Sequence, residues 1–400
     1  TNTTTKTMIK ITDKQKCCGC SACAQRCPKG CISMQQDAEG FFYPKVDTSV
    51  CIDCHLCERV CPVINQSVER KPLRTFAAKS LIDDVRIQSS SGGLFTLLAE
   101  HTIEQGGIVF GVRWDEEWNV RHDYTETKEE LVKFRSSKYV QSIIGDSYLK
   151  AEKFLKEGRE VMFSGTPCQI AGLKHFLRKE YDNLLTVEVI CHSVPSADVW
   201  QQYLSEKLQS LKWDKSYIRH ISFRDKRTGW KGYSFTIENK KSEVYTELAS
   251  KNSFMRGFLA DLYTRPSCHA CPAKQLRSGS DITLGDFWGI ETLMPKIDDN
   301  RGVSAVLANT EKGCKALNDL QMQMYPLSYE ELIKRNPALI RSVAEPKNRV
   351  EFFKDNRHTF EEKIKFLIKT KYTWCIVLRV IARDLLSEKA RKRIRLIMRR

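Results

Sequence analysis

Apolar and polar positions alternate along the middle of the chain so that helices and strands are predicted in turn. Residues 89–107 (SSSGGLFTLLAEHTIEQGG) begin with small residues, continue as an amphipathic helix and stop at two glycines. The apolar run IVFGVRW (108–114) then predicts a strand. Further helices are predicted at 147–158, 169–179 and 196–208, and further strands at 161–165 and 185–191. Such alternation is typical of an α/β domain with parallel strands.

The pattern after residue 208 is rich in strands. The runs YIRHISFRDK, YSFTIEN and EVYTELA (217–226, 233–239 and 243–249) each predict a strand, so we expect a mixed α/β fold. The polar stretch VINQSVERKPLR (63–74) predicts a linker behind a small N-terminal unit. We therefore expect a ferredoxin-like iron–sulfur domain at 1–70, a larger mixed α/β flavin-binding domain at 75–325 and a helical basic tail at 326–400.

Cysteine usage changes this picture from a plain α/β protein to a metal-binding one. Ten of the 16 cysteines lie between Cys17 and Cys61, and none lies between Cys61 and Cys168. The first residues, TNTTTKTMIK, lack the apolar segment of an export signal. We therefore expect reduced thiolates that bind metal in the cytoplasm, rather than disulfides.

The N-terminal cysteines form two copies of the pattern C-x2-C-x2-C-x3-C-P, which is the bacterial ferredoxin motif for two 4Fe-4S clusters. The fourth cysteine of each copy ligates the cluster held by the other copy. The predicted ligands of the first cluster are Cys17, Cys20, Cys23 and Cys61, and those of the second are Cys51, Cys54, Cys57 and Cys27. Zinc, the alternative, needs four thiolates per site and does not account for this repeated spacing. The intervening GFFYPKVD (40–47) predicts a short hairpin, and Cys18 and Cys31 fall outside the register as predicted non-ligands.

Two further features in the large domain could carry chemistry. Cys168 and Cys191 follow predicted strands at the edge where open α/β sheets bind ligands, and Cys268 and Cys271 add a CxxC pair. These residues could form a third cluster, a zinc site or no site at all. The Ser89–Gly93 loop could cradle a phosphate at a helix start or could simply cap that helix.

Several motifs occur in an order that resembles the beta subunits of coenzyme F420-reducing hydrogenase and formate dehydrogenase. They are SSSGG (89–93), SSKYVQS (136–142), FSGTPCQIAGLK (163–174), VICHSVPS (189–196), the CxxC at 268–271 and DITLGDFWG (281–289). The resemblance spans about Cys17 to Ala308. The family commonly has glycine where Ser136 and Ser193 stand here.

The resemblance implies a flavin, FAD or alternatively FMN, next to an iron–sulfur cluster. The flavin or substrate contacts that it implies are Ser90, Ser91, Gly92, Gly93, Lys138, Tyr139, Gln141, Thr166 and Gln169. It implies that Cys168, Cys191, Cys268 and Cys271 bind a third 4Fe-4S cluster. No acid–base pair or nucleophile stands out, and none is required, because a flavin itself interconverts single-electron and hydride chemistry.

The function implied is an oxidoreductase that passes electrons from ferredoxin-type clusters to a flavin, which reduces or oxidises coenzyme F420 or another small or glycan-linked substrate. Its expected partner is reduced ferredoxin or another redox protein. The alternative is an electron-transfer subunit that feeds a partner enzyme and has no substrate of its own. A zinc-dependent binding module is a third class.

Charge is concentrated at the end of the chain. Of the net charge of +16, residues 361–400 contribute +9, with 13 Lys and Arg against 4 Asp and Glu. The apolar run TWCIVLRVIA is too short and too charged to span a bilayer. The tail could lie on the inner face of a membrane as a basic amphipathic helix or pack on the core as a helical hairpin. Its aromatic and basic residues are not interleaved as in single-strand binders, so we expect no nucleic acid.

Overall fold

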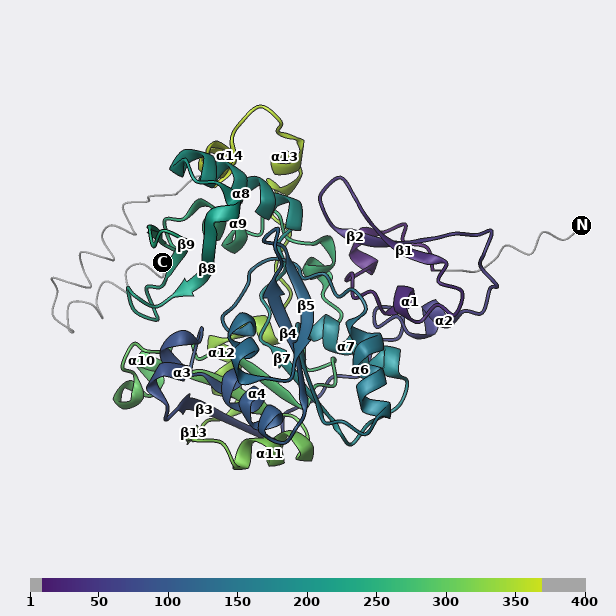
Figure 1. Cartoon of the computed structure of the whole chain (residues 1–400), viewed down its shortest axis with the longest axis horizontal. Coiled ribbons are helices and arrows are strands. Elements are labelled where there is room, and N and C mark those ends of the chain that lie inside the picture. Colours follow the sequence, from purple (N-terminus) through teal and green to yellow (C-terminus); the bar gives the residue numbers. More distant parts are fainter. Residues whose placement is uncertain (1–8, 369–400) are drawn as a thin grey trace, which may run out of the picture.

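The computed structural model describes residues 9–368. A small cysteine-rich domain (residues 9–62, purple in Figure 1) lies against one side of a large domain (residues 74–368). The predicted mixed α/β fold is confirmed, and helices end the described part of the chain. The apolar run and most of the basic tail fall in residues 369–400, outside the described residues.

The cysteine-rich domain is built from one hairpin and two single-turn helices. Strands β1 (Ile32–Gln36) and β2 (Phe42–Val46) pair antiparallel, and α1 (Ala22–Gln25) and α2 (Leu56–Arg59) each lie within one cysteine repeat. The stretch 40–47 supplies only the second strand of the hairpin. The turn lies earlier, because the Asp37 carboxylate accepts hydrogen bonds from the Glu39 and Phe41 N–H groups.

The large domain is organised around one eight-stranded sheet. Its strand order is β13-β3-β12-β11-β7-β6-β4-β5. The strands are β3 (Arg74–Ser80), β4 (Ile108–Trp114), β5 (Val120–Thr125), β6 (Val161–Gly165), β7 (Leu184–Val189), β11 (Ile282–Asp286), β12 (Ser304–Ala308) and β13 (Met322–Pro326). The four central strands β11, β7, β6 and β4 are parallel and the outer pairs are antiparallel. Their carboxyl ends therefore meet at one edge.

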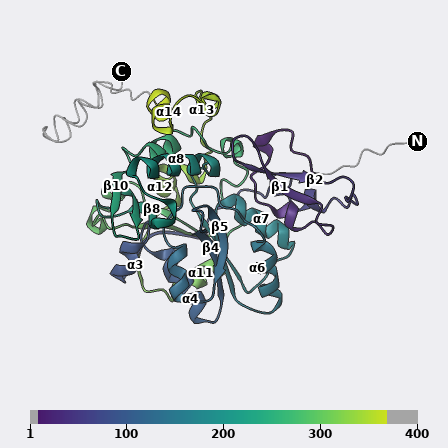
Figure 2. The same ribbon diagram turned by 45° about the horizontal axis from the view of Figure 1, so that its top comes forward.

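Helices cover both faces of this sheet because the strands are apolar on both faces. One face packs on α3 (Asp83–Gln88), α4 (Leu94–Glu104) and α11 (Glu311–Asn318). The other packs on α6 (Ser147–Lys156) and α7 (Pro167–Leu177) in one half, and on α10 (Ile290–Leu293) and α12 (Tyr329–Arg335) in the other. The cysteine-rich domain lies beside α7 in both ribbon views (Figures 1 and 2) and shares its hydrophobic cluster.

A second, smaller layer completes the large domain. Strands β8 (Ile218–Asp225), β9 (Ser234–Asn239) and β10 (Val244–Leu248) form an antiparallel sheet, as the strand-rich sequence predicted. It packs on α8 (Ala197–Leu211), α9 (Ser253–Leu259), α13 (Arg349–Lys354) and α14 (Phe360–Leu367) through an aromatic core that includes Trp200, Phe223 and Phe254. The short α5 (Lys128–Leu131) precedes the loop that carries SSKYVQS.

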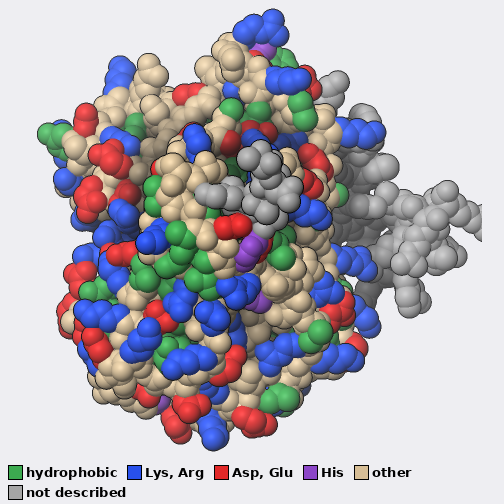
Figure 3. Space-filling model, turned by 90° about the vertical axis from the view of Figure 1, so that its right-hand side faces the viewer, with side chains coloured by type: hydrophobic (Ala, Val, Ile, Leu, Met, Phe, Trp, Pro, Cys, Tyr) green, Lys and Arg blue, Asp and Glu red, His purple; other side chains and the backbone are tan. Residues whose placement is uncertain are grey.

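The surface on the side of the cysteine-rich domain is mixed in character. Lys and Arg side chains are interspersed there with hydrophobic and acidic ones (Figure 3). None of the helices within residues 9–368 is long and apolar enough to cross a membrane.

Candidate functional site

The first cysteine group (Cys17, Cys20, Cys23 and Cys61) gathers around α1, which contains Cys23. Cys20, Cys23 and Cys61 are buried, whereas Cys17 is half-buried. Burial raises the pKa of the Cys23 thiol, and the neighbouring Cys17 and Cys61 thiols raise it further. None of the fifteen cysteines in residues 9–368 forms a disulfide. The four thiols are therefore close together, and their charged forms require a cationic centre.

The second cysteine group (Cys27, Cys51, Cys54 and Cys57) lines a small pocket in the same domain. Cys31, predicted to be a non-ligand, also lines this pocket, with its Sγ 3.3 Å from that of Cys27. Burial, together with the neighbouring Cys27 thiol, raises the pKa of Cys31 to about 12. The Cys31 side chain therefore lies beside the second group, and its place outside the repeated spacing is what predicts that it is not a ligand.

The third cysteine group (Cys168, Cys191, Cys268 and Cys271) is assembled from three separate segments. Cys168 lies in the first turn of α7, Cys191 follows β7, and the CxxC pair lies around a short 3₁₀ helix (Pro266–Ala270). Burial raises the pKa of Cys268, and the Cys191, Cys271 and Cys168 thiols raise it further. The structure therefore brings together four cysteines that lie up to a hundred residues apart in sequence.

Among residues 9–368, no group of three or more His, Cys, Asp and Glu side chains has the arrangement of a site for a single metal ion.

Cys18, the other predicted non-ligand, lies between the first and third cysteine groups. Its buried thiol interacts with the side chains of both Cys20 and Cys168. Its carbonyl accepts a hydrogen bond from Gln141 Nε2 at 3.3 Å. No sequence pattern predicted this position of Cys18. Cys168 is 150 residues away, and only the packing of the two domains brings the two residues together.

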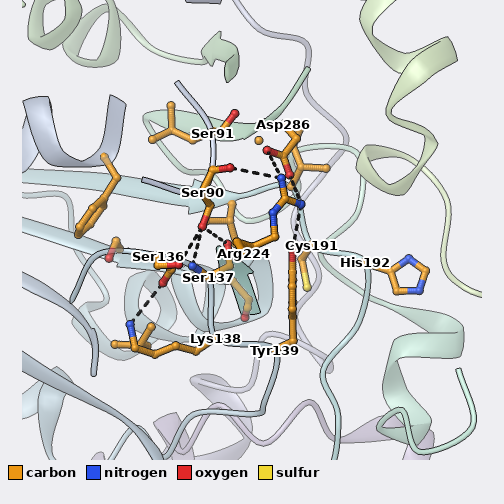
Figure 4. A pocket seen from close by; sticks show the side chains of 18 of the residues that line it. Ser90, Ser91, Ser136, Ser137, Lys138, Tyr139, Cys191, His192, Arg224 and Asp286 are labelled. Carbon is orange, nitrogen blue, oxygen red and sulfur yellow. Dashed lines mark hydrogen bonds and ion pairs between the residues drawn. The ribbon is translucent and has the colours of Figure 1, made fainter. Parts of the chain in front are cut away.

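A cavity of about 690 Å³ opens at the carboxyl ends of the parallel strands, next to the third cysteine group (Figure 4). Cys191 lines it, so the third group and the cavity share a wall. Predicted flavin contacts that line the cavity are Ser90, Ser91, Gly93, Lys138, Tyr139, Thr166 and Gln169. Gly92 and Gln141 are not among its lining residues: Gly92 N–H donates to Ser304 Oγ at 3.0 Å, and Gln141 contacts the cysteine-rich domain.

The loop before α4 forms one end of the cavity. Ser90 Oγ accepts hydrogen bonds from the Ser137 N–H at 2.7 Å and the Ser137 hydroxyl at 3.0 Å. Ser136, beside it, has a left-handed backbone with φ 68°, which suits the glycine common in the resembling family. The two motifs SSSGG and SSKYVQS, 43 residues apart, are thus joined around one cavity wall.

Lys138 brings a positive charge to this end of the cavity without an acidic partner. Its Nζ donates to the carbonyls of Arg135 at 3.0 Å and Ser136 at 3.3 Å, and it forms no ion pair with a carboxylate of the described chain. Burial lowers the pKa of Lys138 to about 7. An anionic ligand would stabilise the protonated form.

Arg224 is a cavity residue that sequence reasoning missed. It is 3% exposed, pairs with Asp286 at 2.9 Å and donates to the Ser90 carbonyl at 3.3 Å. Its guanidinium lies 3.9 Å from the ring centroid of Tyr233, and its Nε has no partner within residues 9–368. The signal that could have revealed Arg224 was its position within the apolar strand ISFRD, because an arginine buried there must have polar partners.

The GTPCQ motif has a clear local role in addition to lining the cavity. Thr166 and Gln169 form a capping box at the start of α7, with the Thr166 N–H donating to Gln169 Oε1 at 2.9 Å. Gln169 Nε2 also donates to Ser142 Oγ at 2.8 Å. This capping begins α7 at Pro167, two residues before the predicted start, and fixes Cys168 in its first turn.

The charges and rings of the cavity suit one kind of ligand. Its charged lining residues are Arg135, Lys138, Arg224, Arg335 and Asp286. Aromatic side chains of Tyr139, Tyr233, Phe258 and Trp288 also face it. A cavity of this size holds a cofactor-sized molecule, and its lining favours one with an anionic group and a flat ring.

Two family models match separate parts of the chain. Residues 16–65 match the model of the 4Fe-4S dicluster domain. Residues 158–329 match that of the coenzyme F420 hydrogenase/dehydrogenase beta subunit, C terminus.

Two curated relatives and one solved structure show the extent of the similarity. One relative, a subunit of the F(420)H(2) dehydrogenase of Methanosarcina mazei, is 26% identical over 282 residues, which are 66% of this chain and 73% of that protein. An uncharacterized ferredoxin of Methanocaldococcus jannaschii is 38% identical over 52 residues, 13% of this chain and 66% of that protein. A chain in a structure of the F420-reducing NiFe hydrogenase complex from Methanosarcina barkeri is 18% identical, with 67% of this chain and 91% of that chain covered and a TM-score of 0.44.

The two N-terminal cysteine repeats thus belong to a 4Fe-4S dicluster domain, and this domain indicates a role in iron–sulfur electron transfer. The resemblance inferred from the ordered motifs is confirmed: beyond the dicluster repeats, residues 158–329 match the model of the coenzyme F420 hydrogenase/dehydrogenase beta subunit, C terminus, and a subunit of an F(420)H(2) dehydrogenase is among the relatives of the chain.

Proposed function

We propose that this chain is an iron–sulfur flavoprotein oxidoreductase, which moves single electrons from the dicluster domain through a third 4Fe-4S cluster to a flavin in the cavity. The single observation that carries the proposal is a continuous path of sulfur sites. The second and first cysteine groups share the cysteine-rich domain, Cys18 packs in one cluster with Cys20 and Cys168, and Cys191 of the third group lines the cavity.

The residues present fit the cofactors proposed. The third group supplies four thiolates, which is the ligand set of a 4Fe-4S cluster. The cavity supplies Lys138 and Arg224 for a phosphate, and Tyr139 and Trp288 for a ring system. Of FAD and FMN, the 690 Å³ volume favours FAD, because a dinucleotide needs the larger space.

The flavin would convert between single-electron and hydride chemistry, and the chain's own residues prepare its surroundings. Arg224 and Asp286 orient each other by their ion pair and hold the Ser90 loop. The capping box of α7 positions Cys168 against the cysteine-rich domain. The buried strand ends around Leu284 and Val187 exclude water from the side of the sheet.

The proposed substrate is coenzyme F420 or another small or glycan-linked molecule, and the proposed electron partner is reduced ferredoxin or a similar one-electron protein. A second candidate is an electron-transfer subunit without a substrate of its own. It is favoured by the Methanosarcina mazei relative, whose name identifies it as one subunit of an F(420)H(2) dehydrogenase.

Anaerobic purification tests the cofactors first. The proposal expects a brown protein with about twelve iron atoms per chain and flavin fluorescence after denaturation. About eight iron atoms would remove the third cluster, and zinc without iron would refute the electron-transfer role.

Turnover then separates the two candidates. Reduced ferredoxin is supplied to the purified chain with coenzyme F420 and a panel of small acceptors, and acceptor reduction is followed by absorbance. Reduction without any partner protein supports the enzyme. Flavin reduction without turnover of any acceptor supports the subunit.

A further inference from the structure

Arg265 joins the large domain to the first cysteine group. It is completely buried, lies three residues before Cys268 and inserts its guanidinium into the cysteine-rich domain. Its Nε donates to the Cys17 carbonyl at 2.9 Å, and its Nη2 lies 3.7 Å from the Cys17 sulfur in hydrogen-bond geometry. Nη2 also donates to the Phe42 carbonyl at 2.9 Å, so the side chain is held rigidly.

The guanidinium lies in a tightly shaped slot. Its carbon lies 4.4 Å from the ring centroid of Tyr43, and its Nη1 donates to Gln141 Oε1 at 3.0 Å. Gly19, within the first C-x2-C, has φ +71°, and a Cβ there would lie 2.9 Å from the Arg265 guanidinium carbon. The glycine in the motif therefore allows the arginine to approach the cluster loop.

The positive charge of Arg265 has no carboxylate counter-charge in the described part of the chain. The nearby Asp37 pairs with Lys14, and the nearby Glu39 pairs with Arg349. A buried charge without a partner is costly. The available negative charge is that of the thiolates of the first cysteine group, which Arg265 meets through the Cys17 sulfur.

The second cysteine group has a different environment. Its arginine neighbour, Arg59, is exposed and donates to the Cys54 carbonyl at 2.6 Å rather than to a sulfur. The carboxylates of Asp53 and Glu58 lie in the same loop and helix. Net charge, hydrogen bonds to sulfur and solvent exposure set cluster potentials. A buried guanidinium at a sulfur raises the potential of the first cluster, and the carboxylates near the second group lower the potential of the second. The greater burial of the first group acts in the opposite direction, because burial disfavours the added negative charge.

We propose that Arg265 raises the reduction potential of the first cluster above that of the second, so that electrons collect at the cluster next to Cys18 and Cys168. In the step concerned, one electron leaves the reduced second cluster, which is oxidised, and reduces the first cluster. No bond or proton moves, and a one-electron iron–sulfur donor refills the second cluster. Arg265 is a positioning and potential-setting residue, and its role rests on the proposed function above.

The test is an EPR-monitored reductive titration of the anaerobically purified full chain, with dithionite as the reductant. Cys54→Ser marks which signal belongs to the second cluster. In Arg265→Gln we expect the potential of the first cluster to fall while that of the second stays. The equilibrium constant for moving one electron from the second cluster to the first should fall about tenfold, because only the difference in this interaction between the oxidised and the reduced cluster is lost.

Two further variants keep the test decisive if Arg265→Gln loses iron. Gln141→Glu places a carboxylate beside the retained arginine and should shift the same potential in the same direction. Arg265→Lys keeps the charge and should shift it less. The matched control is Arg26→Gln, which removes another interdomain arginine, paired with Glu152 at 3.1 Å, without removing an N–H group from a sulfur; it should leave both potentials in place.

The inference would be overturned if the potential of the first cluster stayed unchanged in Gln141→Glu and in an Arg265 variant that keeps its iron. It would also be overturned if Arg26→Gln shifted that potential as much as Arg265→Gln does. Iron and flavin contents of the unmodified chain separate this result from failure of the proposed function. Missing flavin or a missing third cluster refutes the function, whereas full cofactor content with unmoved potentials refutes only the role of Arg265.

Discussion

The cavity wall around Lys138 makes a sharp prediction about flavin binding. Lys138→Gln removes a cation that has no acidic partner in the described chain and whose Nζ contacts only the Arg135 and Ser136 carbonyls at 3.0 and 3.3 Å. If this ammonium meets the flavin phosphate, its loss removes one charge-assisted hydrogen bond, worth about 2 kcal/mol. The dissociation constant for FAD should then rise about thirtyfold.

The pH dependence of binding follows from the same residue. Burial lowers the pKa of Lys138 to about 7, and the protonated form is the one that binds phosphate. As the pH rises through 7, the free site loses its charge and binding weakens. From pH 6 to pH 8 the affinity of the unmodified chain for FAD should fall about tenfold. These two pH values lie one unit below and one unit above the pKa, so the protonated fraction of Lys138 falls by about that factor. In Lys138→Gln it should stay constant.

The assay is calorimetric titration of the flavin-depleted, cluster-loaded protein with FAD at pH 6, 7 and 8. Lys133→Gln is the matched control, because Lys133 is an exposed lysine of the same segment that pairs with Glu130. It should bind as the unmodified chain does. Equal affinity of Lys138→Gln and the unmodified chain at every pH would refute the reasoning. A fall in affinity with pH that persists in Lys138→Gln would assign the titration to another group.

Three other predictions concern the cysteine groups. Cys27→Ser should remove the second cluster, with about four iron atoms lost per chain, whereas Cys31→Ser should leave the iron content unchanged; equal iron in both would show that the ligand was misassigned. Cys168→Ser should abolish the third cluster and slow flavin reduction by dithionite-reduced ferredoxin, while the EPR signals of the dicluster domain remain. Gly172→Ala places a Cβ 2.8 Å from that of Cys20. The overpacking should cost about 1–3 kcal/mol of folding stability, which exceeds the gain of up to ~1 kcal/mol from the higher helix propensity of alanine. A lower urea midpoint and faster proteolysis in the linker at 63–73 should follow, and an unchanged midpoint would show that the two domains part without cost.

Local features of the site could be predicted from sequence because they depend on short spacing. Two copies of C-x2-C-x2-C-x3-C-P bring the dicluster ligands together through loops of a few residues and one pairing between repeats. The helices α4, α6, α7 and α8 and the strands β4, β6 and β7 were predictable from their apolar pattern, whereas β5 and α5 were not predicted. The start of α7 was displaced because the Thr166–Gln169 capping box acts before the apolar pattern begins.

Gln141 illustrates what a motif alone could not decide. It belongs to the same SSKYVQS run as Lys138 and Tyr139, and the resemblance implied one role for all three. In the structure Lys138 and Tyr139 line the cavity, whereas Gln141 faces the other way and contacts Cys18 and Arg265. Whether a residue in such a loop faces the cavity or the domain interface depends on what packs against each side.

The sequence by itself determined the two dicluster repeats and the alternating α/β pattern, because both depend on local spacing or periodicity. Only the tertiary structure decided which distant residues meet. Cys18 touches Cys168 across 150 residues of sequence, and Arg265 reaches the Cys17 sulfur across 248. Such contacts arise when two separately patterned domains bury their surfaces against each other, and no short-range pattern in the chain records that choice.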